Sequence, residues 1–306
     1  RCRGSHCNFI KISVYRLNPS QDTNIASKDC GRHIERALIF IGIIFYLFIY
    51  PHGIYSDGLV RYEALEASVQ KGIWIEHKYS MLGPLFSLPF YFLGLVAKTP
   101  HWWVSRFNAF LFLGFLYFLR KNLKPYFSRS GMGIFILHLL VGTMFSRHVT
   151  DYFGEVFTAC FAALGLALLV LEKDRRGILV LALAAVNAPA NMIAVTLSSS
   201  LLAWLRKSWR YFLPAVIAVV LMVLENYTRF GSLLSHQYLI DEAKTNNALP
   251  YARMNGFHYP FLFGVLSIFL SFGKGILFFS PALLLVKYCQ KFLGEKLRLL
   301  QSLWLA

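Results

Sequence analysis

Long runs of apolar residues without charges recur along this chain and limit the folds that are open to it. They lie near residues 37–52, 81–97, 105–120, 131–147, 152–171, 177–205, 211–227 and 257–288. Segments of about 20 apolar residues match the hydrocarbon thickness of a bilayer, where a helix pairs its own backbone groups. Only 15% of the 306 residues are charged, whereas soluble domains carry about 25%. The sequence therefore predicts an all-α polytopic membrane protein.

The same composition argues against a disordered chain, a coiled coil, a disulfide-rich secreted domain and a nucleic-acid-binding domain. The net charge of +16 is interpreted first as a topology signal, so no nucleic-acid partner is expected. The five cysteines form no CxxC pair, so we expect neither a zinc site nor a disulfide framework. The first apolar run follows about thirty polar, basic residues and is expected to be an uncleaved span rather than a signal peptide.

Charges between the runs predict the orientation of about eight transmembrane helices. With both termini in the cytoplasm, 21 Lys+Arg and 6 Asp+Glu lie on the inner side, against 10 and 9 on the outer side. This positive-inside excess favours the arrangement. It requires residues 81–97, which contain Pro84 and Pro89, to form a broken segment that does not cross the membrane. It also requires residues 177–205 to form a hairpin that turns at residues 187–191.

This arrangement divides the chain into three parts. Residues 1–36 are a basic cytoplasmic tail, residues 37–290 a transmembrane domain, and residues 291–306 a basic cytoplasmic C-terminal end. Outer loops at about 51–104 and 228–274, with interfacial helices, are long enough to carry the function.

The first outer loop is predicted to begin with an amphipathic surface helix. Apolar residues recur there at helical spacing, at Leu59, Tyr62, Leu65 and Val69. Gly72 is placed to end the helix, and Ser56 suits its N-cap. Asp57 then falls in the first turn, where the helix dipole favours an ionised carboxylate that can act as a general base. The alternative interpretation is that Asp57 only stabilises the first turn of the helix and has no catalytic role.

A second acidic pair lies where a span begins. Asp151 and Glu155 are four residues apart and share one helix face, and Arg147 is placed to pair with Asp151. Two carboxylates at this spacing repel each other unless a cation or proton lies between them. The pair is therefore a candidate for binding a divalent metal ion or orienting an acceptor, and interfacial anchoring is the alternative.

Basic residues next to apolar runs on the outer side are candidates for contact with an anionic ligand. They are Lys78, Arg106, Arg147, Arg229 and Lys274. Lys274 lies between two glycines that let the backbone approach a phosphate, although the GxxxxGK[ST] spacing of a P-loop is absent. A lysine that extends from a helix start to the interface explains Lys274 equally well.

Five short stretches occur in an order that resembles one enzyme family. They are Ser56-Asp57-Gly58-Leu59-Val60-Arg61-Tyr62, Lys78-Tyr79-Ser80 with Gly83-Pro84-Leu85, Ser105-Arg106-Phe107-Asn108-Ala109, Asn226-Tyr227-Thr228-Arg229-Phe230-Gly231-Ser232, and Gly273-Lys274-Gly275 with Ser280-Pro281. This order, within residues 37–290, resembles the GT-C class of polyprenyl-phosphate-sugar-dependent membrane glycosyltransferases, the relatives of protein O-mannosyltransferases and the lipid A aminoarabinose transferase.

The resemblance implies an enzyme of the bacterial inner (plasma) membrane with its site on the periplasmic side. It implies that Asp57 is the catalytic base and that Asp151 or Glu155 is a second functional acid. It implies that the donor phosphate is bound by basic residues, which here are Lys78, Lys274, Arg229 and Arg61. The sequence departs from the family in two ways. The family's lysine is often followed directly by two prolines, whereas Tyr79 to Gly83 separate Lys78 from Pro84 here. Family members also often carry further C-terminal helices.

The implied reaction is the inverting transfer of a sugar from an undecaprenyl- or dolichyl-type phosphate to a hydroxyl group of a lipid, glycan or protein acceptor. A transporter or lipid flippase without transferase activity is the main alternative, and a non-catalytic scaffold subunit is another. A transporter favours ionisable residues at mid-membrane depth, whereas the acids of this chain cluster at one face.

Overall fold

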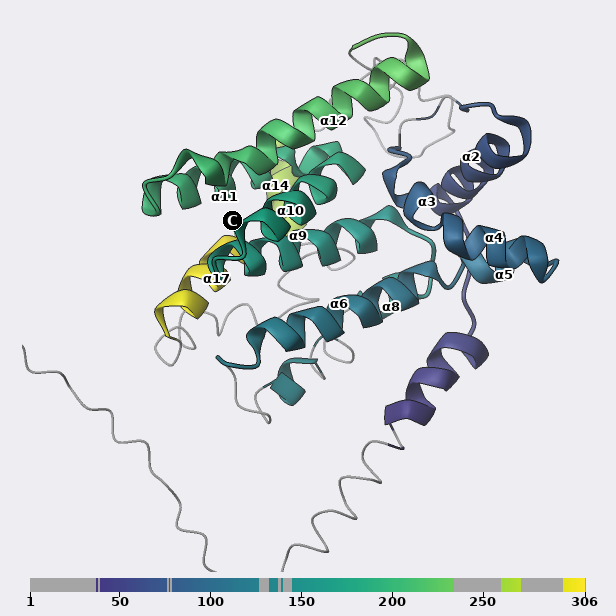
Figure 1. Cartoon of the computed structure of the whole chain (residues 1–306), viewed down its shortest axis with the longest axis horizontal. Helices are drawn as coiled ribbons and strands as arrows, with labels where there is room; N and C mark the ends of the chain where they lie inside the picture. The colour runs from purple at the N-terminus through teal and green to yellow at the C-terminus, as the bar shows by residue number, and fades with distance from the viewer. Residues whose placement is uncertain are drawn as a thin grey trace, which may run out of the picture. The chain divides into compact units, whose positions relative to one another are not determined.

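Helices dominate the structure (Figure 1), which is a computed structural model. It describes residues 37, 39–75, 77, 79–126, 132–136, 139, 145–233, 260–270 and 294–305. No β-strand occurs among these residues, so the prediction of an all-α fold is confirmed for them. The chain divides into two compact units, Arg1–Tyr50 and Pro51–Ala306. The described part of the first unit is an apolar helix, Ile39–Ile49, which ends in the π-helical turn η1 (Phe45–Ile49).

Helix α9 (Gly154–Val170) is the helix around which the second unit is built. It contacts α6 (Phe107–Leu123), α8 (Phe145–Val149), α10 (Asp174–Asn187) and α17 (Glu295–Leu305). Its sequence is rich in alanine and leucine and contains no proline, which favours an uninterrupted helix.

Helices α9 and α10 pack closely because each contributes a glycine to their contact. A Cβ on Gly165 of α9 would lie 2.8 Å from the backbone nitrogen of Leu181, and a Cβ on Gly177 of α10 would lie 2.8 Å from that of Leu169. Gly165 of α9 meets Leu181 of α10, whereas Leu169, which comes later in α9, meets Gly177, which comes earlier in α10. The two helices are therefore antiparallel. Small residues that let two backbones approach are typical of helix contacts in membranes.

The predicted hairpin in residues 177–205 is confirmed. Helix α10 ends at Asn187, the 3₁₀ turn η2 (Pro189–Asn191) follows, and α11 (Met192–Leu205) then returns. Pro189 disfavours a helical conformation at Ala188, which is extended with φ −139° and ψ 96°. After η3 (Trp209–Phe212), α12 (Leu213–Phe230) packs against α10 and α11.

The predicted break in residues 81–97 is also confirmed. Helix α3 (Leu82–Phe86) and helix α4 (Leu88–Val96) meet at Ser87, and α5 (Pro100–Val104) follows. The Ser87 hydroxyl donates a hydrogen bond to the carbonyl oxygen of Pro84 at 2.7 Å. At about 1.5 Å per residue neither α3 nor α4 reaches across a bilayer.

Two helical stretches are long and apolar enough to cross a membrane, Pro100–Leu123 and Trp209–Phe230. Three described apolar helices are shorter, Ile39–Ile49, Gly154–Val170 and Pro189–Leu205. The expected number of about eight is therefore not reached among the described residues. Much of the spans expected at 131–147 and 257–288 lies outside them, apart from short helices such as α14 (Phe261–Leu270).

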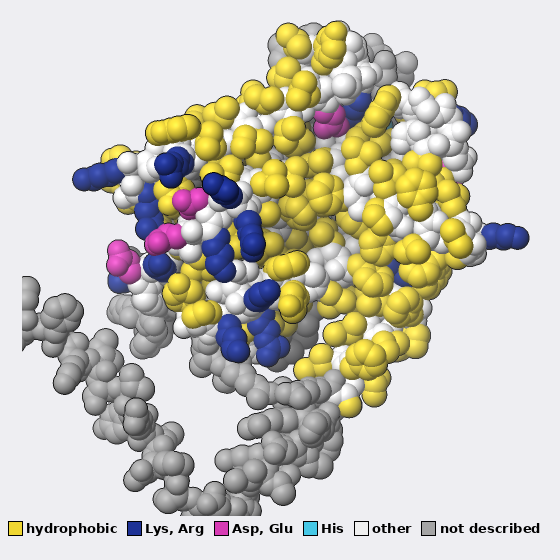
Figure 2. Space-filling model, in the orientation of Figure 1, with side chains coloured by type: hydrophobic (Ala, Val, Ile, Leu, Met, Phe, Trp, Pro, Cys, Tyr) yellow, Lys and Arg dark blue, Asp and Glu magenta, His cyan; other side chains and the backbone are white. Residues whose placement is uncertain are grey.

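Lysine and arginine side chains gather at one end of the second unit (Figure 2), which we call the basic end. Its described basic residues are Arg120, Lys121, Lys124, Lys173, Arg175, Arg176, Arg206, Lys207, Arg210, Lys296 and Arg298. Glu172 holds several of these segments together, because its Oε1 accepts from Arg206 Nη1 at 3.2 Å and from Lys296 Nζ at 3.0 Å. Clusters that the charge count assigns to one side of a membrane thus lie together in the fold.

Candidate functional site

Helix α2 (Asp57–Lys71) carries the first candidate acid. It begins at Asp57 and ends before Gly72, which has a φ of +66°, as the sequence predicts. The expected N-cap hydrogen bond from Ser56 is absent, because Ser56 has a φ of +48° rather than the extended backbone of a capping residue. Its hydroxyl instead donates to Asp57 Oδ1 at 3.3 Å. The expected apolar face is also narrower than predicted, since Leu59 is 41% exposed while Tyr62 and Leu65 are buried.

Two segments that are about 95 residues apart in the sequence meet beside Asp57. The Gly53 N–H donates to the Thr150 carbonyl at 3.0 Å, and the Tyr152 N–H donates to the Gly53 carbonyl at 3.1 Å. Gly58, the residue after Asp57, lies against the Tyr152 carbonyl. The structure therefore brings the start of α2 next to the segment that contains Asp151.

Arg61 lies one turn after Asp57 and is buried between these segments. Its Nη1 donates to the Ser80 carbonyl at 3.2 Å, and its Cζ lies 4.7 Å from the centre of the Tyr79 ring. Gly154 leaves room for it, since a Cβ there would lie 2.5 Å from Arg61 Cζ. Burial lowers the pKa of Arg61, and the carboxylates of Glu155 and Asp57 oppose that shift. Arg61 is thus a buried cation within electrostatic range of two candidate acids.

The two acids of the second pair do not share a helix face as predicted, because α9 begins at Gly154 and Asp151 lies before it, in a bridge to Gly53. Asp151 is buried, and its Oδ2 lies 3.6 Å from Arg147 Nη2, which confirms the predicted pairing. Asn108 fixes this segment by donating to the carbonyl oxygens of Asp151 at 2.7 Å and Phe153 at 2.9 Å. Glu155 is exposed. Within the described residues no group of three His, Cys, Asp or Glu side chains is placed to hold a metal ion.

Arg229 holds the loop that connects α2 to α3, through the loop's described residues. Its Nη1 donates to the Tyr79 carbonyl at 2.8 Å, and its Nη2 donates to the His77 carbonyl at 2.9 Å. Glu225 pairs with Arg229 at 3.0 Å and accepts from the Met81 N–H at 2.6 Å. Arg229 and Arg61 therefore bind carbonyl groups on the two sides of this loop. The other two predicted phosphate ligands, Lys78 and Lys274, lie outside the described residues.

His77 is buried in the same loop. Its Nδ1 accepts a hydrogen bond from the Tyr79 N–H at 3.2 Å. Burial, and then the charges of Arg229 and Arg61, lowers the pKa of His77 to about 4. The ring is therefore neutral at pH 7. Neither His77 nor Glu225 was predicted as a site residue from the sequence. For Glu225 the available signal was its position as a lone carboxylate near the end of an apolar run.

Asn187 joins three elements, whereas the sequence suggested only a place in a hairpin turn or in a transporter-like helix break. Its Oδ1 accepts a hydrogen bond from the Gly83 N–H at 3.0 Å, in the first turn of α3. Its Nδ2 donates to the Gly154 carbonyl at 2.8 Å and to Thr158 Oγ1 at 2.9 Å, both on α9. The side chain is buried and thus fixes the position of the first turn of α9, which carries Glu155.

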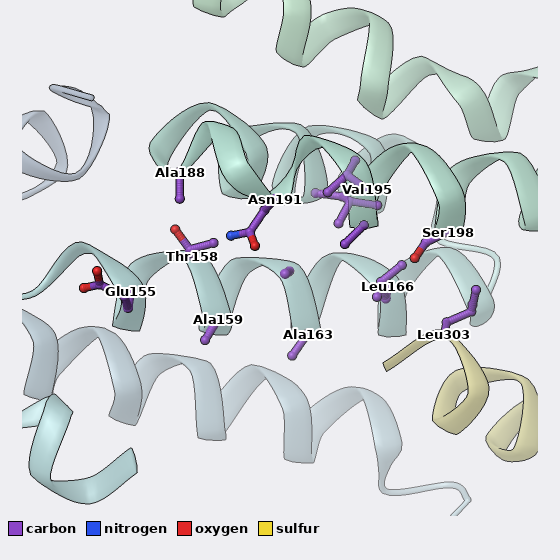
Figure 3. A pocket seen from close by; sticks show the side chains of 13 residues that line it. Glu155, Thr158, Ala159, Ala163, Leu166, Ala188, Asn191, Val195, Ser198 and Leu303 are labelled. Carbon is purple, nitrogen blue, oxygen red and sulfur yellow. The ribbon is translucent and has the colours of Figure 1, made fainter. Parts of the chain in front are cut away.

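A cavity of about 520 Å³ runs between α9 and α11 (Figure 3). Glu155 lies at one end of it and Leu303 of α17 at the other, and Thr158, Asn191 and Ser198 add hydroxyl and amide groups. The remaining lining is alanine, valine and leucine. The cavity is therefore an apolar channel with a carboxylate at its end.

The fold and the site define a helical protein with candidate acids at one end of its central helix and a cluster of cations at the other. No family model, curated protein sequence or solved structure matches the chain. The resemblance to the GT-C class therefore depends on the short sequence motifs alone.

Proposed function

We propose that this chain is an integral membrane glycosyltransferase of GT-C type. In this proposal it transfers a sugar, with inversion, from a polyprenyl-phosphate donor to a hydroxyl of a lipid, glycan or protein acceptor. The observation that carries the proposal is the contact between Gly58, which follows Asp57, and the carbonyl of Tyr152, which follows Asp151, with Glu155 in the first turn of α9. This contact brings together the backbone segments that carry three acidic residues, the residue type that serves as a general base.

The placement of charges supports a site on the outer face of the bacterial inner membrane. The 17 residues of α9 span about 25 Å, close to the thickness of the hydrocarbon core. Glu155 lies in the first turn of this helix, and the basic end lies just beyond its last turn. By the positive-inside rule the basic end faces the cytoplasm, so the acids face the periplasm.

In the proposed reaction Asp57 accepts the proton of the acceptor hydroxyl as its oxygen attacks the anomeric carbon. The bond from that carbon to the phosphate oxygen breaks on the opposite side, and the lipid phosphate leaves as an anion. Cations stabilise this leaving group, and Lys78 and Lys274 are the proposed contacts. Arg61 and Arg229, which hold the carbonyl groups next to Lys78, are proposed to position that lysine rather than to bind phosphate themselves.

The cavity beside Glu155 supports a lipid-linked donor. Its apolar lining suits an isoprenoid chain, and Glu155 at its end is one of the three proposed acids. A divalent metal ion bound by Asp151 and Glu155 is part of the proposal, and such an ion would neutralise the repulsion between the two carboxylates.

Replacing Asp57 tests the proposal directly. Purified Asp57→Asn protein should transfer a radiolabelled sugar from undecaprenyl phosphate about 10²- to 10⁴-fold more slowly than wild type. Glu63→Gln is the matched control, because Glu63 is an exposed acid on the same helix, and it should leave the rate unchanged. Wild-type turnover by Asp57→Asn would rule out Asp57 as the base.

Transport is the second candidate function, favoured by the helix break at Pro189 that lies beside the cavity. Broken helices next to a cavity are typical of transporters. A proteoliposome assay with a fluorescent polyprenyl phosphate separates the two functions. Translocation without sugar transfer would favour the flippase, and transfer without translocation the enzyme.

A further inference from the structure

A second apolar groove opens on the other side of α9, between α6 and α10. Both helices pack against α9, and the groove between them has a volume of about 400 Å³. Phe161 and Leu168 of α9 are among the residues that line it, and Gly114 and Phe118 are on the α6 side. From Leu111 to Asn122 it follows about three turns of α6, or roughly 16 Å.

The groove is polar only where it meets the basic end. Asn122 and Arg176 are the two residues in its lining that are not apolar, and both belong to that end. Lys173 donates a hydrogen bond to Asn122 Oδ1, which brings a second cation to the same place. Arg176 is exposed and has no hydrogen-bond or ion-pair partner within the described part of the chain.

We infer that this groove binds one anionic phospholipid, with an acyl chain between α6 and α10 and the headgroup phosphate at Arg176 and Lys173. An apolar trough that ends beside two cations, Arg176 and Lys173, matches an acyl chain that ends in a phosphate. A guanidinium binds a phosphate through two parallel hydrogen bonds, which favours Arg176 as the main contact. A zwitterionic lipid carries its own cation and gains less there.

This inference requires the membrane placement of the proposed function but not its catalytic residues. The polar end of the groove, where the headgroup is placed, lies at the opposite end of α9 from Glu155. A protein that binds the lipid and transfers no sugar would leave the inference intact and refute the proposed function. A protein that transfers sugar and shows no lipid preference would refute the inference and leave the proposed function intact.

Native mass spectrometry of the full-length protein in detergent tests the inference. Phosphatidylglycerol and phosphatidylcholine with identical acyl chains are titrated separately, and the bound lipids are counted. Wild type should bind one phosphatidylglycerol at least about tenfold more tightly than phosphatidylcholine, and Arg176→Gln should remove that preference. Arg175→Gln is the matched control, since Arg175 is the exposed neighbour outside the groove lining, and it should bind like wild type.

A second variant tests the acyl-chain part of the groove. Gly114 lines it, and no atom lies within 4 Å of a Cβ built there, so Gly114→Leu should fill the groove without distorting the fold. This variant should weaken binding of both lipids about tenfold. Equal binding of the two lipids by wild type, an unchanged preference in Arg176→Gln, or displacement of the lipid by millimolar inorganic phosphate would each overturn the inference.

Discussion

Gly58 packs directly against the backbone of Tyr152, so closely that a Cβ on Gly58 would lie 2.6 Å from the Tyr152 carbonyl oxygen. No Cβ is accommodated at that distance, and the obstructing atom is backbone, which cannot rotate away. This contact joins the start of α2, with Asp57, to the segment that carries Asp151. A glycine at position 58 is therefore a requirement of the candidate site rather than of the helix.

Replacing Gly58 should separate the two acidic segments. Gly58→Ala should lower the free energy of unfolding by about 1–3 kcal/mol through overpacking, and the rate of sugar transfer by about tenfold to a hundredfold. Thermal unfolding in detergent and the transfer assay measure the two effects. Gly114→Ala is the control, because its Cβ meets no atom within 4 Å. Equal behaviour of the two variants would contradict the proposed role of this contact.

The Asn187 side chain should contribute strongly to stability. Asn187→Leu leaves the Gly83 N–H and the Gly154 carbonyl without their partner in a buried site, so unfolding should become easier by about 2–4 kcal/mol. Asn191→Ala, in the next turn, is the matched control. Its side chain makes no hydrogen bond within the described residues, and the change should be within about 0.5 kcal/mol. Similar melting temperatures for both variants would show that Asn187 is not needed to join α9, α10 and α3.

Two ion pairs of the same spacing should differ in their contribution to stability. The side chains of Arg229 and Glu225 are 4% and 18% exposed, whereas Arg147, which pairs with Asp151, is 68% exposed. Arg229→Gln should destabilise the protein by about 3 kcal/mol and expose the loop between α2 and α3 to protease, because a buried guanidinium loses its bonds to Glu225 and to the His77 and Tyr79 carbonyls. Arg147→Gln should cost about 1 kcal/mol or less. Equal losses would mean that burial does not determine the strength of these pairs.

Acidification should destabilise the protein through His77. The folded state holds the pKa of His77 at about 4, below its value of 6.5 in an unfolded chain. As the pH falls through this window, the unfolded state takes up a proton that the folded state excludes, so the free energy of unfolding decreases, by up to about 3 kcal/mol. His77→Asn, which retains an acceptor for the Tyr79 N–H, should reduce the slope between pH 6.5 and 4. An unchanged slope would show that another group causes the acid sensitivity.

Local sequence patterns were sufficient to predict where helices form and where several of them are interrupted. Pro189 ended a helix where the hairpin was expected, and Gly72 ended α2, because proline and glycine act on the backbone within one turn. The clustering of lysine and arginine predicted which helix ends lie together, and Glu172 joins them in the structure. These features depend on residues that are close in sequence or on charge alone.

Only the tertiary structure decided which polar groups meet. Arg229 binds carbonyl groups about 150 residues away, and Arg61 is buried against Gly154 and binds the Ser80 carbonyl, so both residues hold the loop between α2 and α3. Asn187 and Gly58 acquire their roles from partners on other helices. A hydrogen bond between distant segments depends on how apolar surfaces pack around it. Residue spacing encodes the period of a helix, but it does not encode the direction in which that helix faces its neighbours.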